Sequence, residues 1–255
     1  MLLAIDIGNS NTSIGLFDEN KLKASWNIAT ELHRMGDEYA ATFLGLLRHE
    51  GISGKDINKV AMCSVVPPLV SVFEEFLKRY FGVKPLVVEA GTKTGVRIRM
   101  DNPREVGADR IVNAAAAHHL YQGSVVIVDL GTATTFDTVS AEGDYLGGAI
   151  APGIDSAVEA LTERAAMLPR IELVRPTKAI GTNTISAMQS GMIFGYTGMV
   201  EEIVRRIVIE LEEKPKVIAT GGYAEFMLKQ TPIIEEVNKN LTLIGLRQVY
   251  YMNNA

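Results

Sequence analysis

The chain has 255 residues, of which 47% are hydrophobic and 22% charged, and its formal net charge is −5. This composition suits a globular protein with one large or two small cores. It lacks the basic surplus of nucleic-acid binders and the polybasic segment of membrane-surface proteins. Cys63 is the only cysteine, so no disulfide forms within the chain. No signal-peptide pattern opens the sequence and no apolar run approaches the ~18 residues of a membrane span, so we expect a cytoplasmic protein.

The first half of the chain is expected to contain three strands followed by alternating helices and strands. Residues 2–7 and 12–17 are apolar on either side of a Gly/Asn/Ser/Thr turn, which is typical of a hairpin. Helices are predicted where apolar residues recur at helical spacing, as in 37–49. A helix is also predicted where two consecutive prolines, Pro67 and Pro68, open a segment. The expected strands are 21–28, 59–66 and 86–90, and the expected helices are 37–49, one beginning at Pro67, and 104–120.

The second half of the chain begins with the same pattern of three strands. The expected strands are 124–131, 134–140, 144–151 and 216–222, and the expected helices are 153–166 and 184–212. One more strand and a helix follow. Within the 184–212 helix, Glu201–Arg205 and Glu202–Arg206 are predicted to be ordinary surface pairs one turn apart.

The two halves also share a motif at constant separation. Asp6 and Asp129 differ by 129 − 6 = 123 positions, and the same offset aligns Gly8 with Gly131, Asn9 with Thr132 and Thr12 with Thr135. A repeated three-strand unit followed by helices predicts an α/β fold made of two similar halves. We expect the first half to span 1–115 and the second 116–255.

The residue types in these two bends, residues 6–13 (the first bend) and 129–135 (the second bend), suit polyphosphate. Glycine allows the backbone to approach an anion, and backbone N–H groups with Asn, Ser or Thr side chains donate hydrogen bonds to phosphate oxygens. The aspartate can hold a cation that neutralises the phosphate. Each bend alone is also compatible with a plain hairpin turn, but the matched pair favours phosphate binding. The sequence contains no G-x-x-x-x-G-K-[ST] motif, so this is not a P-loop.

A third candidate is the pair Gly221-Gly222, where a predicted strand leads into a helix. Paired glycines allow a flat ring to lie against the main chain, although a strand–Gly–Gly–helix junction is often explained by packing alone. After two phosphate bends it fits an adenine site. Cys63 lies in a predicted strand and is expected to be a core residue.

Six short motifs along the chain resemble those of a known family. DIGNSNT, DLGTATTFD and ATGG resemble the acetate and sugar kinase/Hsc70/actin superfamily, and DNPREVGADR, GGAIAPG and GTNTISAMQSG narrow the resemblance to type III pantothenate kinase. The resemblance implies duplicated actin-like (ribonuclease H-like) βββαβα halves with a nucleotide cleft between them. It also implies ATP-dependent phosphorylation of pantothenate, the first step of coenzyme A biosynthesis.

The resemblance implies a role for each matching residue. Asp109 would be the general base, and Gly107, Ala108, Arg110 and Thr184 would bind pantothenate together with it. Asp6 would serve magnesium–ATP. The ATP phosphates would also contact Ile7, Gly8, Asn9, Ser10, Asn11, Thr12, Ser13 and Thr132, with Gly221 near the nucleotide. Asp129 would hold a monovalent cation, potassium or ammonium. Family members are homodimers, and many carry an aromatic residue where this chain has Met100, so the pocket here is expected to differ in shape.

Without the resemblance, the chemistry of these residue types leaves some of the roles open. A carboxylate can accept the proton of an attacking alcohol, but Asp is also a favoured helix cap, so residue type alone does not separate the two roles of Asp109. Asp129 could serve magnesium or orient water instead of a monovalent cation. The competing functions are a kinase of the same fold for another small hydroxylated substrate and a nucleotide-binding regulator without phosphotransfer. The GADR segment, 107–110, favours the pantothenate kinase.

Overall fold

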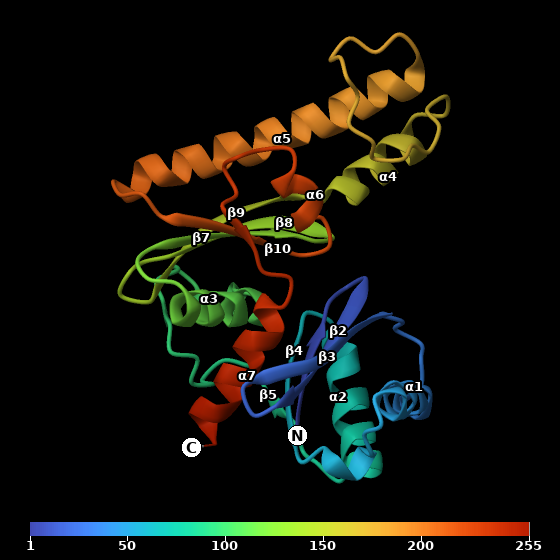
Figure 1. Cartoon of the computed structure of the whole chain (residues 1–255), viewed down its shortest axis with the longest axis vertical. Helices are drawn as coiled ribbons and strands as arrows, with labels where there is room; N and C mark the ends of the chain where they lie inside the picture. The colour runs from blue at the N-terminus through green and yellow to red at the C-terminus, as the bar shows by residue number, and fades with distance from the viewer. Residues whose placement is uncertain (255) are drawn as a thin grey trace. The chain divides into compact units, whose positions relative to one another are not determined.

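The computed structural model describes residues 1–254 and divides into two compact units (Figure 1). The first unit contains residues 1–120 together with the C-terminal segment that begins at Asn240, and the second contains residues 121–239. The expected division at 115/116 assigned the C-terminal segment to the second half. In the structure this segment is a helix that packs on the first unit, because its apolar side chains Leu243, Leu246 and Val249 join a core there.

The first unit is built on a five-stranded sheet of order β3-β2-β1-β4-β5. The first three strands form an antiparallel meander, and β4 and β5 run parallel to β1. The strands are β1 (Leu2–Ile7), β2 (Asn11–Asp18), β3 (Lys21–Ala29), β4 (Lys59–Ser64) and β5 (Leu86–Val87), with a further two-residue strand β6 (Arg97–Ile98) later in the chain.

Alternation along β1 divides the hydrophobic side chains between two cores, one on each face of the sheet. Leu3, Ile5 and Ile7 join the core that contains the aromatic side chains of α1 and α2, whereas Leu2 and Ala4 join the core formed with α3 and α7. The helices are α1 (Gly36–His49), α2 (Pro67–Phe76), α3 (Ala108–Leu120) and α7 (Leu241–Asn253). Asp6 follows Ala4 in this alternation and therefore belongs to the face covered by α3 and α7.

Helix α3 is shorter than the sequence predicts. The expected helix at 104–120 is divided into a 3-10 turn (Pro103–Glu105) and α3, which begins only at Ala108. The interruption contains Gly107, where a glycine is needed for reasons of packing described below. Two other short turns, Gly54–Asp56 and the π-helical Leu77–Phe81, connect elements of the same unit.

The five strands of the second unit have the same order and directions, β9-β8-β7-β10-β11. Its strands are β7 (Val125–Leu130), β8 (Ala133–Val139), β9 (Asp144–Pro152), β10 (Lys216–Thr220) and β11 (Glu236–Val237), and its helices are α4 (Ile154–Arg164), α5 (Thr184–Leu211) and α6 (Ala224–Leu228). Val126, Val128 and Leu130 of β7 pack with Val200 and Val204 of α5 in the core of this unit. The predicted duplication is thus confirmed in the strand order.

The repeat is not in constant register through the bends. Ile7 pairs with Thr12 in the first hairpin, whereas Leu130, its counterpart, pairs with Thr134. The return strands are therefore related by 134 − 12 = 122 positions, and the second bend is one residue shorter than the first. The expected match of Thr12 with Thr135 is wrong, and both Thr12 and Thr134 are buried.

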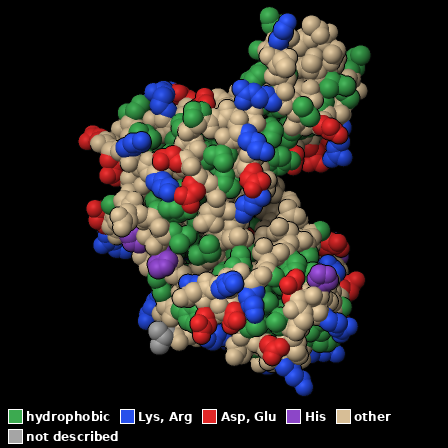
Figure 2. All heavy atoms as spheres, in the orientation of Figure 1, with side chains coloured by type: hydrophobic (Ala, Val, Ile, Leu, Met, Phe, Trp, Pro, Cys, Tyr) green, Lys and Arg blue, Asp and Glu red, His purple; other side chains and the backbone are tan. Residues whose placement is uncertain are grey.

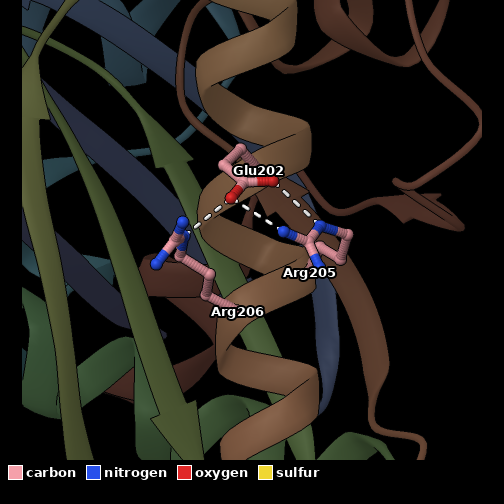
Figure 3. Close-up of polar contacts among 3 residues, drawn as sticks. All are labelled: Glu202, Arg205 and Arg206. Atoms are coloured by element: carbon pink, nitrogen blue, oxygen red, sulfur yellow. Dashed lines mark hydrogen bonds and ion pairs between the residues drawn. The ribbon is translucent and has the colours of Figure 1, made fainter.

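Helix α5 carries charged side chains on its outer surface (Figure 3). Glu202 accepts hydrogen bonds from the guanidinium groups of Arg205 and Arg206, at 2.8 and 2.7 Å. The predicted Glu202–Arg206 pair is present. Glu201 accepts a 2.6 Å hydrogen bond from Thr231 instead of pairing as predicted with Arg205. These exposed pairs contribute little to stability.

Positive and negative side chains are interspersed on the face of the molecule shown in Figure 2. This mixture agrees with the small net charge of −5. Among residues 1–254, no helix is both long enough and apolar enough to cross a membrane.

The contact between α3 and α7 leaves no room for a side chain at Gly245. A Cβ atom there would lie 2.3 Å from the carbonyl oxygen of Val112. We expect Gly245→Ala to lower the free energy of unfolding by roughly 1–3 kcal/mol through overpacking. The matched control is Gly45→Ala in α1, where the added Cβ would meet nothing within 4 Å. That variant should gain up to ~1 kcal/mol from helix propensity. Urea denaturation measures both, and equal effects at the two positions would contradict this packing account.

Candidate active site

The first bend joins β1 to β2, and the side chains at its tip face solvent. Its backbone is closed by a hydrogen bond from Gly8 N to Asn11 O of 3.0 Å. Asn9, Ser10 and Asn11 are exposed, while Thr12 is buried and forms a 2.8 Å hydrogen bond with the hydroxyl of Thr30. The loop therefore presents short polar side chains on a backbone that the flanking strands hold in place, as expected of a phosphate-binding bend.

Asp6 is the penultimate residue of the apolar strand β1, and it lies beside Cys63 of the parallel strand β4. The two residues are directly paired in the β1–β4 register, and the Cys63 thiol donates a hydrogen bond to Asp6 Oδ1 at 3.3 Å. Cys63 is fully buried and belongs to the core formed by α3 and α7. The sequence predicts it as a core residue, and the structure confirms this position but adds a polar contact.

Asp109 is the second residue of α3. Its Oδ1 atom accepts a 2.9 Å hydrogen bond from the backbone N–H of Arg110, so it satisfies one of the free N–H groups in the first turn of the helix. A Cβ atom on Gly107 would lie 2.5 Å from the same oxygen. Glycine at 107 therefore gives the Asp109 carboxylate the space that it occupies.

Asp6 and Asp109 are close enough to repel each other. Burial, followed by the charge of Asp109, raises the pKa of Asp6 from its ordinary 3.8 to about 7, while the hydrogen bond from Cys63 lowers it. Burial and the nearby charges of Asp6 and Asp109 likewise raise the pKa of the Cys63 thiol. Cys63 thus keeps its proton, and the thiol is the donor in the contact with Asp6. The structure brings together the predicted cation carboxylate and the predicted base.

The second bend is held by the start of α4. The carbonyl oxygen of Thr132 accepts hydrogen bonds from Gly153 N at 3.1 Å and from the Ser156 hydroxyl at 2.8 Å. A Cβ atom on Gly153 would lie 2.2 Å from the Gly131 carbonyl oxygen. These contacts explain why the GGAIAPG motif ends in glycine, and they fix the position of Thr132, which the sequence predicts as a phosphate contact.

The turn after β10 packs against Asp129. Gly221 has φ +88°, and a Cβ atom there would lie 2.6 Å from both Asp129 Oδ1 and the carbonyl oxygen of Leu130. Only glycine meets both requirements without strain. The next turn is fixed by a 3.2 Å hydrogen bond from Tyr223 N to Leu130 O. Gly221 and Asp129, predicted separately as nucleotide and cation contacts, are therefore neighbours.

Tyr223 was not found by the sequence analysis. Its hydroxyl donates to Asp155 of α4, and burial together with this hydrogen bond raises its pKa to about 12. Asp155 and Tyr223 thus link the beginning of α4 to the Gly221-Gly222 turn. The local sequence carries no signal for this contact, because the two residues are far apart in the chain.

Thr184 occupies a different part of the second unit. It is the exposed first residue of α5, after the N-cap Asn183, whose side chain accepts a 2.9 Å hydrogen bond from Ser186 N. It lines an open depression of about 570 Å³ whose remaining walls come from α4, α5 and the segment between them. No residue of the second bend or of the Gly221 turn lines this depression, so the structure of this unit does not bring Thr184 to them.

The residues of the first unit fit a magnesium ion that is bound chiefly by phosphate and water. Magnesium is usually held by one or two protein carboxylates plus substrate phosphates. Asp6 supplies such a carboxylate, and a cation would offset the burial cost of its charge and its repulsion from Asp109, which together raise its pKa. In residues 1–254 no group of three or more His, Cys, Asp or Glu side chains is arranged to hold a metal. An ion at Asp6 would therefore need oxygen ligands from a bound phosphate.

Replacing Asp6 by Asn removes a charge that burial penalises. Because the folded-state pKa is raised, the folded chain keeps a proton that the unfolded chain has lost between about pH 4 and about pH 7. Wild-type stability falls with rising pH across this window. One pKa unit corresponds to ~1.4 kcal/mol, so Asp6→Asn should be more stable than wild type by at least ~1 kcal/mol at pH 8, with a smaller gain near pH 4. Urea denaturation without added magnesium or nucleotide tests this, and equal stability at pH 8 would contradict it.

Comparison with known families agrees with the arrangement of these motifs. A sequence model of the type III pantothenate kinase family matches residues 2–206. Two type III pantothenate kinases from strains of Dehalococcoides mccartyi are each 58% identical to this chain over 254 residues, covering 100% of this chain and 98% or 97% of the relative.

Solved structures with lower identity share the fold. A Baf family protein from Campylobacter jejuni superposes with a TM-score of 0.64 at 21% identity, covering 99% of this chain and 98% of that one. The activator of 2-hydroxyisocaproyl-CoA dehydratase from Clostridium difficile has a TM-score of 0.56 at 11% identity, with 99% and 93% covered. A ROK hexokinase from Thermus thermophilus has a TM-score of 0.51 at 15% identity, with 98% of both chains covered.

These structures support the predicted duplicated actin-like fold, and the full-length relatives identify the activity. The chain belongs to the type III pantothenate kinase family, and its reaction is the ATP-dependent phosphorylation of pantothenate in coenzyme A biosynthesis.

Proposed function

We propose that Asp109 is the general base of this phosphoryl transfer. The primary hydroxyl of pantothenate is a poor nucleophile, and a carboxylate within hydrogen-bond distance can accept its proton as the hydroxyl attacks the γ-phosphorus. The carrying observation is that Gly107 leaves space for the Asp109 carboxylate at the start of α3. Asp109 can thus accept the hydrogen bond from Arg110 N in the first turn of the helix and also act as the general base.

The two carboxylates of the first unit would have separate tasks. Asp6 is the penultimate residue of β1 and the first residue of the first bend, so it is suited to the cation that accompanies the ATP phosphates. Asp109 stands on a different element and would face the acceptor alcohol. When magnesium is bound, it neutralises phosphate charge and polarises the transferred group. Its positive charge would also favour the ionised form of Asp6, whose pKa is raised by burial and by Asp109.

The remaining predicted contacts divide between substrate and nucleotide. We assign Gly107, Ala108, Arg110 and Thr184 to pantothenate, with Arg110 suited to a carboxylate or amide oxygen. In support, a pocket of about 180 Å³ lies beside Ala108 and is lined largely by apolar residues. The proposed nucleotide contacts are Asp6, Ile7, Gly8, Asn9, Ser10, Asn11, Thr12, Ser13, Thr132 and Gly221. Since Thr12 is buried and bonded to Thr30, its part would be to brace the first bend.

Asp129 is proposed to hold a monovalent cation, potassium or ammonium. It occupies the same position in the second repeat as Asp6 does in the first, and Gly221 and the Leu130 carbonyl pack beside it. A carboxylate with nearby carbonyl oxygens supplies hard oxygen ligands for such a cation. A cation here would reduce repulsion with the ATP phosphates.

The assembled enzyme is proposed to be a cytoplasmic homodimer with pantothenate and ATP as its ligands and no nucleic-acid or membrane partner. The second unit has large exposed hydrophobic side chains, which a second copy of the chain would cover in a homodimer. Met167 is 93% exposed, Ile180 85% and Ile150 66%.

Asp109→Asn should lower kcat at least roughly a hundredfold, because a general base typically contributes ~10²–10⁴-fold. The melting temperature and the KM values for ATP and pantothenate should change much less. Asp18→Asn, which alters an exposed carboxylate of the same unit, is the matched control and should keep wild-type activity. A near-wild-type kcat in Asp109→Asn would remove Asp109 from this role.

Exchanging potassium for sodium at constant ionic strength should lower activity severalfold, and ammonium should replace potassium. In Asp129→Asn this preference should be lost, because its carboxylate ligand is gone. A coupled assay with pantothenate, magnesium and ATP measures the effect. Wild-type enzyme that works equally well in sodium would contradict the assignment of Asp129.

A further inference from the structure

We propose that Cys63 is a positioning residue for magnesium–ATP: its buried thiol fixes the orientation of the Asp6 carboxylate by a hydrogen bond to Oδ1. This inference rests on the proposed role of Asp6. The sequence analysis treats Cys63 as part of the core, and none of the motifs of the resemblance includes it. The 3.3 Å contact from the thiol to Asp6 Oδ1 gives it a task beyond packing.

The position of Cys63 in the sheet makes this contact well defined. Asp6 and Cys63 are lateral neighbours in the parallel β1–β4 pairing, in the same register as Ala4 with Ala61. The thiol has no exposed surface and packs in the core formed with α3. A side chain confined by two strands and a helix has few other orientations. The S–H group is therefore held beside Asp6 whether or not a ligand is present.

The second repeat has an equivalent residue. Thr220 of β10 pairs with Asp129 of β7 just as Cys63 of β4 pairs with Asp6 of β1. Thr220 is also buried, with 3% of its surface exposed, at the end of the apolar run Val217–Ala219. Both repeats thus place a short side chain with one donor hydrogen on the parallel strand beside the aspartate. This agreement argues that the donor itself, and not only the volume of Cys63, matters.

The local electrostatics give the donor a physical purpose. The nearby Asp109 charge would push the Asp6 carboxylate away from it, and the partly buried carboxylate has limited access to water that could hold it in place. The thiol supplies a fixed partner for one oxygen and leaves the other for a ligand. Partners of this kind orient metal ligands, and their loss typically costs roughly 10–100-fold in metal affinity or activity.

The test compares Cys63→Thr with Cys63→Val. Threonine and valine have the same shape, but only threonine has a donor, and Thr220 shows that threonine fits the equivalent position. Calorimetry would measure binding of magnesium with a non-hydrolysable ATP analogue, and kinetics would give kcat and the KM for magnesium–ATP. Cys63→Val should bind the analogue roughly tenfold more weakly, with a matching rise in KM. Cys63→Thr should stay within about twofold of wild type by the same reasoning.

Melting temperatures control for folding, and Cys63→Ser with Cys63→Ala is the second pair if either β-branched variant does not fold. In that pair serine should retain binding that alanine loses. Equal analogue affinity in the donor and non-donor members of a folded pair would overturn the proposal. The proposed role of Asp6 is tested separately by Asp6→Asn: analogue binding as tight as in the wild type would reject that role without reference to Cys63.

Discussion

The candidate site depends on the repulsion between two carboxylates near the end of β1, those of Asp6 and Asp109. Asp6 ends an apolar strand, and Asp109 arrives in the first turn of α3, which packs on the same face of the sheet. Burial and the charge of Asp109 raise the pKa of Asp6 to about 7. Such a pair is costly for a structural purpose and useful for catalysis, because a bound cation and an acceptor alcohol can each take one carboxylate.

The two repeats use one topology for different tasks. Each places an aspartate at the end of its first strand, a tight bend after it, and a short donor on the neighbouring parallel strand. In the first unit the helix that begins after Gly107 adds a second carboxylate, that of Asp109. The second unit has a bend one residue shorter and packs Gly221 against its aspartate. In the proposed mechanism the first repeat supplies the acid–base chemistry together with phosphate contacts, and the second supplies further nucleotide contacts and a cation site.

Much of the fold could be predicted from local sequence, because apolar runs separated by Gly, Asn, Ser and Thr specify the hairpins in both halves. The duplication followed from the repetition of this pattern. What the sequence did not reveal depends on pairing between distant segments. The helix at Leu241–Asn253 belongs to the first unit because it packs on α3. The residue of the second repeat equivalent to Thr12 is Thr134 and not Thr135, because the second bend is one residue shorter than the first.

The site shows the same division. Asp6, Gly107 and Asp109 could be named from motifs, and their proximity follows from the structure of the first unit. The contact of Cys63 with Asp6 depends on the β1–β4 register, and the contact of Tyr223 with Asp155 depends on the packing of α4 against the Gly221 turn. Neither carries a signal in its neighbouring residues. Thr184 could be placed at a helix start, and the structure adds that it lines a depression walled by α4 and α5.

A crystal structure of the enzyme with magnesium, a non-hydrolysable ATP analogue and pantothenate tests the division of labour between the two carboxylates most directly. The account predicts the primary hydroxyl of pantothenate within ~2.6–3.2 Å of an Asp109 carboxylate oxygen, with magnesium on the Asp6 side of the phosphates. A complex in which Asp109 points away from that hydroxyl, or in which the magnesium and its water ligands do not contact Asp6, would contradict it.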